Sequence, residues 1–359
     1  MSELEQSYMD RLREGAEKFL AYLGIEAGDQ VILMPSWESM KSDMETIDVL
    51  RDVGGKIGAD ITTIPIDALG MRGDPNPVIV EALYRCDCFI GIGDKTPNPI
   101  TGHAWSALTA RWDFGAKQVD LRGGKGILAS EASLYPAEIT IAIAREVRKN
   151  FMKDGVLRFT DSNGSDVISP FKASDVFFGG SFDADTFGNG QRCDWPLGQI
   201  MIHSEDTLAG TAMVEAIRRI PNVISPAVRF DIKGGHVEPE IREETAAIRK
   251  MFADPQNSNI CTKLFLGLNP RGSIEEGIVK SNFGNMVQKA GVVCFMIGDK
   301  AGFMATKEGT GGYLLAPTIR VGDDIVSENG RLRALDSAVV RDVAARFGDP
   351  DELLSSHRF

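Results

Sequence analysis

The spacing of apolar residues changes near the middle of the chain, and this change divides the sequence into two parts. In the first part, apolar residues recur at helical spacing over residues 9–23, 44–53, 77–84, 101–114 and 136–151. Between these stripes lie short apolar runs at residues 31–34, 59–66, 88–92 and 118–121. Strands that alternate with helices in this way predict a parallel sheet flanked by helices, doubly wound in outline.

After residue 154 the apolar runs are short and are separated by Asn, Gly, Ser and Asp, as is typical of antiparallel strands. The predicted strands cover residues 156–159, 166–169, 176–178, 199–203, 264–268 and 292–297. Helices are expected near residues 239–252 and 336–347. We therefore predict an N-terminal α/β domain over residues 1–154 and an α+β domain, which carries the active-site cleft, over residues 155–359.

One stretch of the second part, residues 194–211, combines a turn with a strand of alternating character. Pro and Gly residues at its start set the turn, and the run QIMIH at residues 199–203 follows. Because side chains alternate along a strand, Gln199, Met201 and His203 share one face, and the two isoleucines share the other. This strand either presents Gln199 and His203 to a cavity or is an ordinary core strand that tolerates one amide.

The composition is that of a globular protein. The chain has 359 residues, 43% of them hydrophobic, which suffices for two sizeable cores. Its apolar runs are far shorter than a membrane span, and its N-terminus lacks a basic segment followed by an apolar core. A net charge of -12 makes nucleic acids and anionic membranes poor partners. Scattered cysteines are typical of reduced thiols, so we expect a cytoplasmic protein. The expected partner is a small-molecule substrate.

Nucleotide and metal motifs are incomplete in this sequence. Two glycine-rich turns, at residues 91–96 and 123–126, lack the full spacing that cradles a phosphate, so nucleotide binding is not expected. The chain has four histidines and no H-E-x-x-H or H-x-H element. His236 with Glu238 and Glu240 is the best local cluster, and capping of the helix expected at residues 239–252 explains it better than metal binding.

An ordered series of short motifs runs through residues 155–332. It comprises Gly164-Ser165-Asp166, Trp195-Pro196-x-Gly198, Glu205-Asp206-Thr207-x-x-Gly210-Thr211, Gly234-Gly235, Gly267-Leu268-Asn269-Pro270 and Gly330-Arg331-Leu332. In order and spacing these motifs resemble the family of the aminopeptidase T type metallo-aminopeptidases and the 2,5-dihydroxypyridine 5,6-dioxygenases. The resemblance implies a two-domain subunit, commonly a homodimer, with a metal in the C-terminal domain. The first half agrees only in its α/β pattern.

The chain departs from this family at the positions where the family binds metal. Gln199 stands where the resemblance implies a metal-binding Glu, and Lys263 where it implies an iron-binding His or a Glu. Tyr313-Leu314-Leu315 aligns with an expected His-x-Asp pair, and Cys294 lies close to the position of an aminopeptidase His. Because lysine, leucine and a neutral amide are poor ligands, we predict that the inherited metal site is lost and that no metal cofactor is bound.

These replacements suggest a pocket that works without metal. Lys263 can polarise a carbonyl or bind a substrate carboxylate in place of the lost cation. Tyr313 can act as general acid, Gln199 can orient water, and Cys294 or His203 can serve as nucleophile or base. The remaining candidates, for substrate binding, are Trp195 and Asn269.

The first functional prediction is therefore a metal-independent hydrolase of a small nitrogen-containing substrate, such as a cyclic amide or an N-heterocycle. Two alternatives stay open: a metal-dependent ring-cleaving dioxygenase or aminopeptidase, and a non-catalytic binding protein on the same fold. Lys263, Cys294 and Tyr313 can also be structural, as a paired cation, an inert buried thiol and a packed ring.

Overall fold

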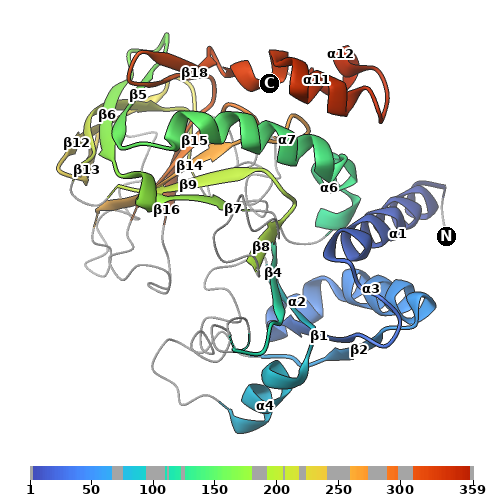
Figure 1. Cartoon of the computed structure of the whole chain (residues 1–359). Helices are drawn as coiled ribbons and strands as arrows, with labels where there is room; N and C mark the ends of the chain where they lie inside the picture. Colours follow the sequence, from blue (N-terminus) through green and yellow to red (C-terminus); the bar gives the residue numbers. More distant parts are fainter. Residues whose placement is uncertain are drawn as a thin grey trace. The chain divides into compact units, whose positions relative to one another are not determined.

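The computed structural model describes residues 3–66, 76–93, 110, 113–122, 126–179, 192–204, 207–217, 224–240, 259–273, 289–297 and 310–355. Contacts divide the chain into two compact units, and Figure 1 labels many of their helices and strands. Unit 1 contains the described residues of Met1–Ala137 and Gly180–Leu197, and unit 2 those of Glu138–Gly179, Gly198–Lys280 and Met286–Phe359. The chain thus crosses between the units more often than the single boundary expected between residues 154 and 155 implies.

Unit 1 is built on a five-stranded sheet in which every neighbouring pair of strands is parallel. The order β2-β1-β3-β4-β8 is formed by Asp60–Thr63, Gln30–Pro35, Cys88–Gly93, Lys117–Arg122 and Arg192–Trp195. The predicted parallel sheet is therefore confirmed. The edge strand β8 of this sheet comes from beyond residue 154. The charged residues of β8 gave no indication of a strand in the sequence.

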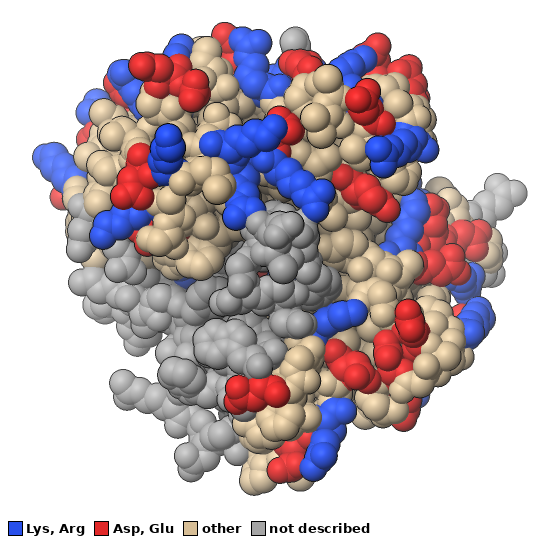
Figure 2. Space-filling model, in the orientation of Figure 1, with Lys and Arg blue, Asp and Glu red and all other residues tan. Residues whose placement is uncertain are grey.

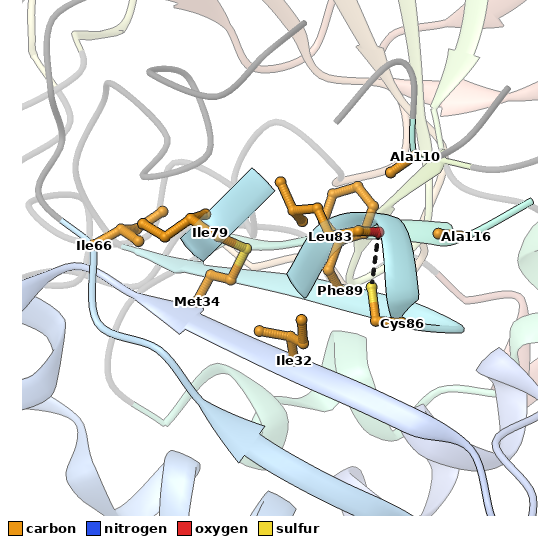
Figure 3. Packing of buried hydrophobic residues seen from close by; sticks show 9 residues of the cluster. All are labelled: Ile32, Met34, Ile66, Ile79, Leu83, Cys86, Phe89, Ala110 and Ala116. Atoms are coloured by element: carbon orange, nitrogen blue, oxygen red, sulfur yellow. Dashed lines mark hydrogen bonds between the residues drawn. The ribbon is translucent and has the colours of Figure 1, made fainter. Parts of the chain in front are cut away.

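The helices of unit 1 follow the predicted apolar stripes: α1 (Glu3–Leu23), α3 (Met44–Ile57) and α4 (Pro77–Arg85), with the short α2 (Trp37–Ser42) and α6 (Glu131–Leu134) between strands. In Figure 3, α4 packs Ile79 and Leu83 against Ile32 and Met34 of β1 and Phe89 of β3. Ile32 and Met34 reach the same cluster because residues two apart point to one side of a strand. The helix predicted at residues 101–114 lies largely outside the described residues.

Unit 2 consists of two antiparallel sheets, as the second half of the sequence predicts. The eight-stranded sheet has the order β13 (His236–Pro239), β12 (Val228–Lys233), β10 (Ala209–Val214), β6 (Asp166–Phe171), β5 (Gly155–Thr160), β17 (Thr318–Val321), β18 (Asp324–Glu328) and β19 (Arg331–Leu332). The six-stranded sheet has the order β11 (Ala216–Ile217), β16 (Thr310–Leu314), β15 (Val293–Ile297), β14 (Cys261–Gly267), β9 (Gln199–His203) and β7 (Val176–Gly179).

The core of unit 2 lies between these two sheets. The ring of Phe159 on β5 meets the ring of Phe295 on β15 edge-to-face, with centroids 6.0 Å apart. A Cβ atom on Gly312 of β16 would come within 3.1 Å of Val214 and 3.2 Å of Phe230, side chains of the other sheet. The opposite face of the six-stranded sheet is therefore the one that remains for a functional site.

Helices α7 (Ala137–Arg148), α11 (Ala338–Ala344) and α12 (Pro350–Leu353) complete the described part of unit 2, and the first two agree with predicted helices. The expected helix cap at His236, Glu238 and Glu240 is wrong, since His236 and Glu238 belong to strand β13. Val237 between them is buried opposite Ile232 of β12, so the segment has the alternation of a strand, not a helix. Residues 241–258 lie outside the described part.

Charged side chains of both signs are spread over the face of the molecule in Figure 2. Several form exposed ion pairs, such as Arg158 with Asp166 at 2.7 Å, and such pairs contribute about 0–1 kcal/mol each. None of the helices in the described ranges is long and apolar enough to cross a membrane.

Candidate functional site

The register of the six-stranded sheet brings the five predicted catalytic residues to one face. His203 of β9 lies opposite Lys263 of β14, and Gln199 lies opposite Gly267. One strand further, Cys294 of β15 lies opposite Tyr313 of β16. Directly opposed residues point to the same side of a sheet, and residues two apart along a strand do so as well. We call this side the site face, and its larger side chains are Phe177, Gln199, Met201, His203, Lys263, Phe265, Cys294, Met296 and Tyr313.

Only one end of the site face is accessible. Cys294 and Tyr313 have no accessible surface, and Gln199 is also buried. Their roles as nucleophile, general acid and water-orienting amide stay predictions, because a substrate has little or no surface at which to meet them. The accessible patch is formed by the half-buried Met201, His203, Lys263 and Met296 and by Phe177, which is 44% exposed.

The accessible patch combines two cation-forming side chains with an apolar floor. Lys263 and His203 are direct neighbours across β14 and β9, and Met296 of β15 is the next residue in the same row. The His203 ring meets the Phe177 ring edge-to-face, with centroids 5.2 Å apart and planes at 80°. This edge contact orients the imidazole.

Trp195 and Asn269, the predicted substrate-binding residues, lie elsewhere. Trp195 is a core residue of unit 1, where its ring centroid is 5.3 Å from both Phe19 and Tyr22 of α1. Asn269 is buried in unit 2, and its Oδ1 atom accepts a hydrogen bond from the backbone N–H of Arg271 at 2.9 Å. Both contacts stabilise the fold, and a role in substrate binding stays a prediction for either residue.

Beside Asn269 lies a buried lysine that the sequence does not single out. Lys289 is 5% exposed and forms a parallel bridge with Asn269, and its Nζ donates to the carbonyl of Gly272 at 3.4 Å. Burial lowers the pKa of Lys289 from 10.5 to about 8. No motif surrounds this lysine, so its burial could only be found in three dimensions.

The lowered pKa of Lys289 predicts a rise in stability at alkaline pH. Between pH 8 and pH 10.5 the unfolded chain binds a proton that the folded chain has released, so the free energy of unfolding increases with pH in this window. We expect a gain of about 3 kcal/mol in the free energy of unfolding from this group across the window, and no such gain in Lys289→Met. Urea unfolding at pH values across the window measures it.

The comparison between wild type and Lys289→Met is needed because buried thiols oppose the effect. Burial raises the pKa of Cys261 to about 12. Above the pKa of an exposed thiol, the unfolded chain releases a proton that the folded chain keeps, so this group lowers the free energy of unfolding as the pH rises. That loss is common to both proteins and cancels in their difference. Parallel stability profiles for the two proteins would contradict the assignment of Lys289.

A second group of buried charges lies in unit 1. Arg192 of β8 contacts Asp120 of β4 at 2.5 Å and Asp194 at 3.9 Å, and Gln118 Nε2 donates to Asp120 at 3.5 Å. Asp120 and Asp194 are opposite each other in the parallel register. The arrangement is an ion pair between a half-buried arginine and a buried carboxylate, and it joins the edge strand to the sheet.

Metal ligands do not gather in the described part of the chain. No group of three His, Cys, Asp or Glu side chains there is placed to hold an ion. Where the resemblance implies His-x-Asp, Leu315 instead donates its backbone N–H to a Glu215 oxygen at 2.9 Å. The described residues therefore do not fit an iron site of two imidazoles and a carboxylate.

No family model and no curated protein sequence matches the chain. Among solved structures, the chain is similar to the 2,5-dihydroxypyridine dioxygenase of Pseudomonas putida KT2440, with a TM-score of 0.69 and 16% sequence identity. The match covers 92% of this chain and 98% of that chain. A match to glycerol dehydrogenase of Schizosaccharomyces pombe, with a TM-score of 0.21 and 10% identity over 44% of this chain and 32% of that one, carries no argument. The first match establishes the fold.

This comparison contradicts the predicted hydrolase. The similar structure is a dioxygenase, which is an oxidoreductase, and the likeness spans nearly the whole of both chains. Of the two metal-dependent alternatives, the dioxygenase is the one that the name of the similar protein matches, and nothing tests the aminopeptidase. The hydrolase prediction failed because it was inferred from replaced ligands, and a missing ligand does not identify the reaction of the site that remains.

Proposed function

We propose that this chain is a ring-cleaving oxygenase that acts on a small hydroxylated ring compound. The observation that carries the proposal is the fold likeness to a 2,5-dihydroxypyridine dioxygenase over 92% of this chain. A shared fold alone does not fix a reaction, so the side chains of the site must also suit it. The predicted homodimer and cytoplasmic location stay predictions.

The accessible patch suits the binding of an ionised ring hydroxyl. Lys263 and His203 lie side by side on the site face, and a nearby cation favours the charged form of an acidic hydroxyl. The ionised ring is richer in electrons and is oxidised more readily. Met201, Met296 and Phe177 supply apolar surface for the ring itself. In this proposal Lys263 and His203 hold and orient the ring anion.

Non-haem iron is the metal that ring-cleaving dioxygenases of the resembled family use, and the described residues do not fit it. In our proposal, side chains of this chain alone bind and orient the ring, and the enzyme works without the metal that the resembled family uses. Elemental analysis of the pure protein tests this part of the proposal. Stoichiometric iron, zinc or cobalt would contradict it, and iron-dependent turnover would leave the oxygenase proposal standing.

Oxygen uptake tests the proposed reaction. The purified chain is mixed with 2,5-dihydroxypyridine and with other dihydroxylated rings in air-saturated buffer. We expect ring absorbance to fall while one O2 is consumed per ring opened, and label from ¹⁸O2 to appear in the product. Ring loss without O2 uptake, or no reaction with any hydroxylated ring, would refute the oxygenase proposal.

A further inference from the structure

We infer that the ring substrate carries a carboxylate next to its acidic hydroxyl, and that Lys263 and His203 bind this carboxylate together at the accessible patch, where the lysine charge also favours ionisation of the neighbouring hydroxyl. This inference rests on the proposed function, because it names the substrate class of the same site. It concerns the described residues of the patch, namely Phe177, Met201, His203, Lys263 and Met296.

The register of the sheet places the two nitrogen-bearing side chains where both can reach one carboxylate. Lys263 and His203 oppose each other directly across β14 and β9. The Cβ atoms of such pairs are about 4.5–5.5 Å apart, so both side chains can reach one bound group. The lysine ammonium and an imidazole N–H can each donate to one carboxylate oxygen. Hydrogen bonds of this charge-assisted kind are about twice as strong as neutral ones.

The rest of the patch suits a flat aromatic body. Met201 and Met296 are soft, polarisable side chains that contact rings favourably, and Phe177 forms the edge of the patch. Gly311 follows in the row of Lys263 and Met296. A Cβ atom there would lie 3.1 Å from Cys294 Sγ and 3.5 Å from Met296 Sδ, so glycine keeps this part of the face free of a projecting side chain.

The charge of the site face favours an anion. None of the described strand residues whose side chains point to this face is acidic. Lys263 and His203 also interact with other parts of the chain, and the inference uses only their shared position, the charge of the lysine and the N–H groups of both side chains. A half-buried cation attracts an anion more strongly than an exposed one does, because the effective dielectric constant is lower.

The test measures binding with O2 excluded, so that turnover does not enter. Calorimetric titration compares two probes that differ in one group: 2,5-dihydroxybenzoate, which carries a ring carboxylate, and 1,4-dihydroxybenzene, which lacks it. We expect the wild-type chain to bind the carboxylate probe at least about tenfold more tightly. Lys263→Met should abolish this preference, Lys263→Arg should keep most of it, and His203→Gln should reduce it.

The chain provides a matched control in a second Lys–His pair. Lys233 and His236 oppose each other in the same way on β12 and β13 of the other sheet. Lys233→Met should leave the preference unchanged. Equal binding of both probes by the wild type, no binding of either, or a preference that survives Lys263→Met in a folded variant would overturn the inference. A carboxylate preference without O2 uptake would instead refute the proposed function and leave this binding site in place.

Discussion

Replacing Arg192 with methionine is expected to lower the free energy of unfolding by about 3–5 kcal/mol. The guanidinium lies 2.5 Å from an Asp120 oxygen and 3.9 Å from an Asp194 oxygen. These carboxylate side chains are 1% and 10% exposed, so methionine would remove the guanidinium from beside two buried negative charges. Urea unfolding of the whole chain, followed by circular dichroism, measures the loss.

An exposed ion pair provides the control for Arg192. Arg158 donates two hydrogen bonds to Asp166, at 2.8 Å and 2.7 Å, but both side chains are about half exposed. Arg158→Met should therefore cost no more than about 1 kcal/mol. Adding Asp120→Asn to Arg192→Met removes one of the two buried negative charges and should recover part of the lost free energy of unfolding. Equal costs for the two arginines would mean that the Arg192 cluster is hydrated rather than buried.

The same buried pair explains where sequence-based prediction of the fold stops. Strands β1 and β3 are apolar and buried along nearly their whole length, so their runs can be recognised in the sequence. β8 reads Arg-Cys-Asp-Trp, and its charged residues suggest a loop. Only the pairing of Arg192 with Asp120, 72 residues earlier in the chain, makes those charges compatible with a buried strand. A contact so distant in sequence leaves no local pattern.

The candidate site was predictable in part. The alternation in residues 199–203 correctly places Gln199 and His203 on one face of a strand. Lys263 was selected through the family resemblance, and nothing in the spacing indicates that it would lie opposite His203. Burial separates the remaining candidates: Tyr313 and Cys294 share this face but have no accessible surface. Burial of that kind depends on what packs against a face, which a strand's own sequence does not specify.

Replacing Gly291 with alanine is expected to lower the free energy of unfolding by several kcal/mol. Gly291 has a φ of +82°, and a Cβ atom would lie 1.8 Å from the carbonyl oxygen of Gly330. Its N–H donates to the Gly267 carbonyl at 3.0 Å, which joins the start of β15 to the end of β14. The left-handed conformation costs about 1–2 kcal/mol for alanine, and the backbone clash forces a shift that costs about 1–3 kcal/mol more.

Gly322→Ala separates these two costs. Gly322 also has a positive φ, +59°, but no atom lies within 4 Å of the position of an added Cβ. Its replacement should cost only the conformational term, about 1–2 kcal/mol. Because Gly291 lies two residues before β15, which carries Cys294 and Met296, Gly291→Ala should also weaken binding of the ring carboxylate probe, whereas Gly322→Ala should not. Equal unfolding free energies for the two variants would show that the strands adjust to the added methyl group. The site face would then tolerate movement near the start of β15.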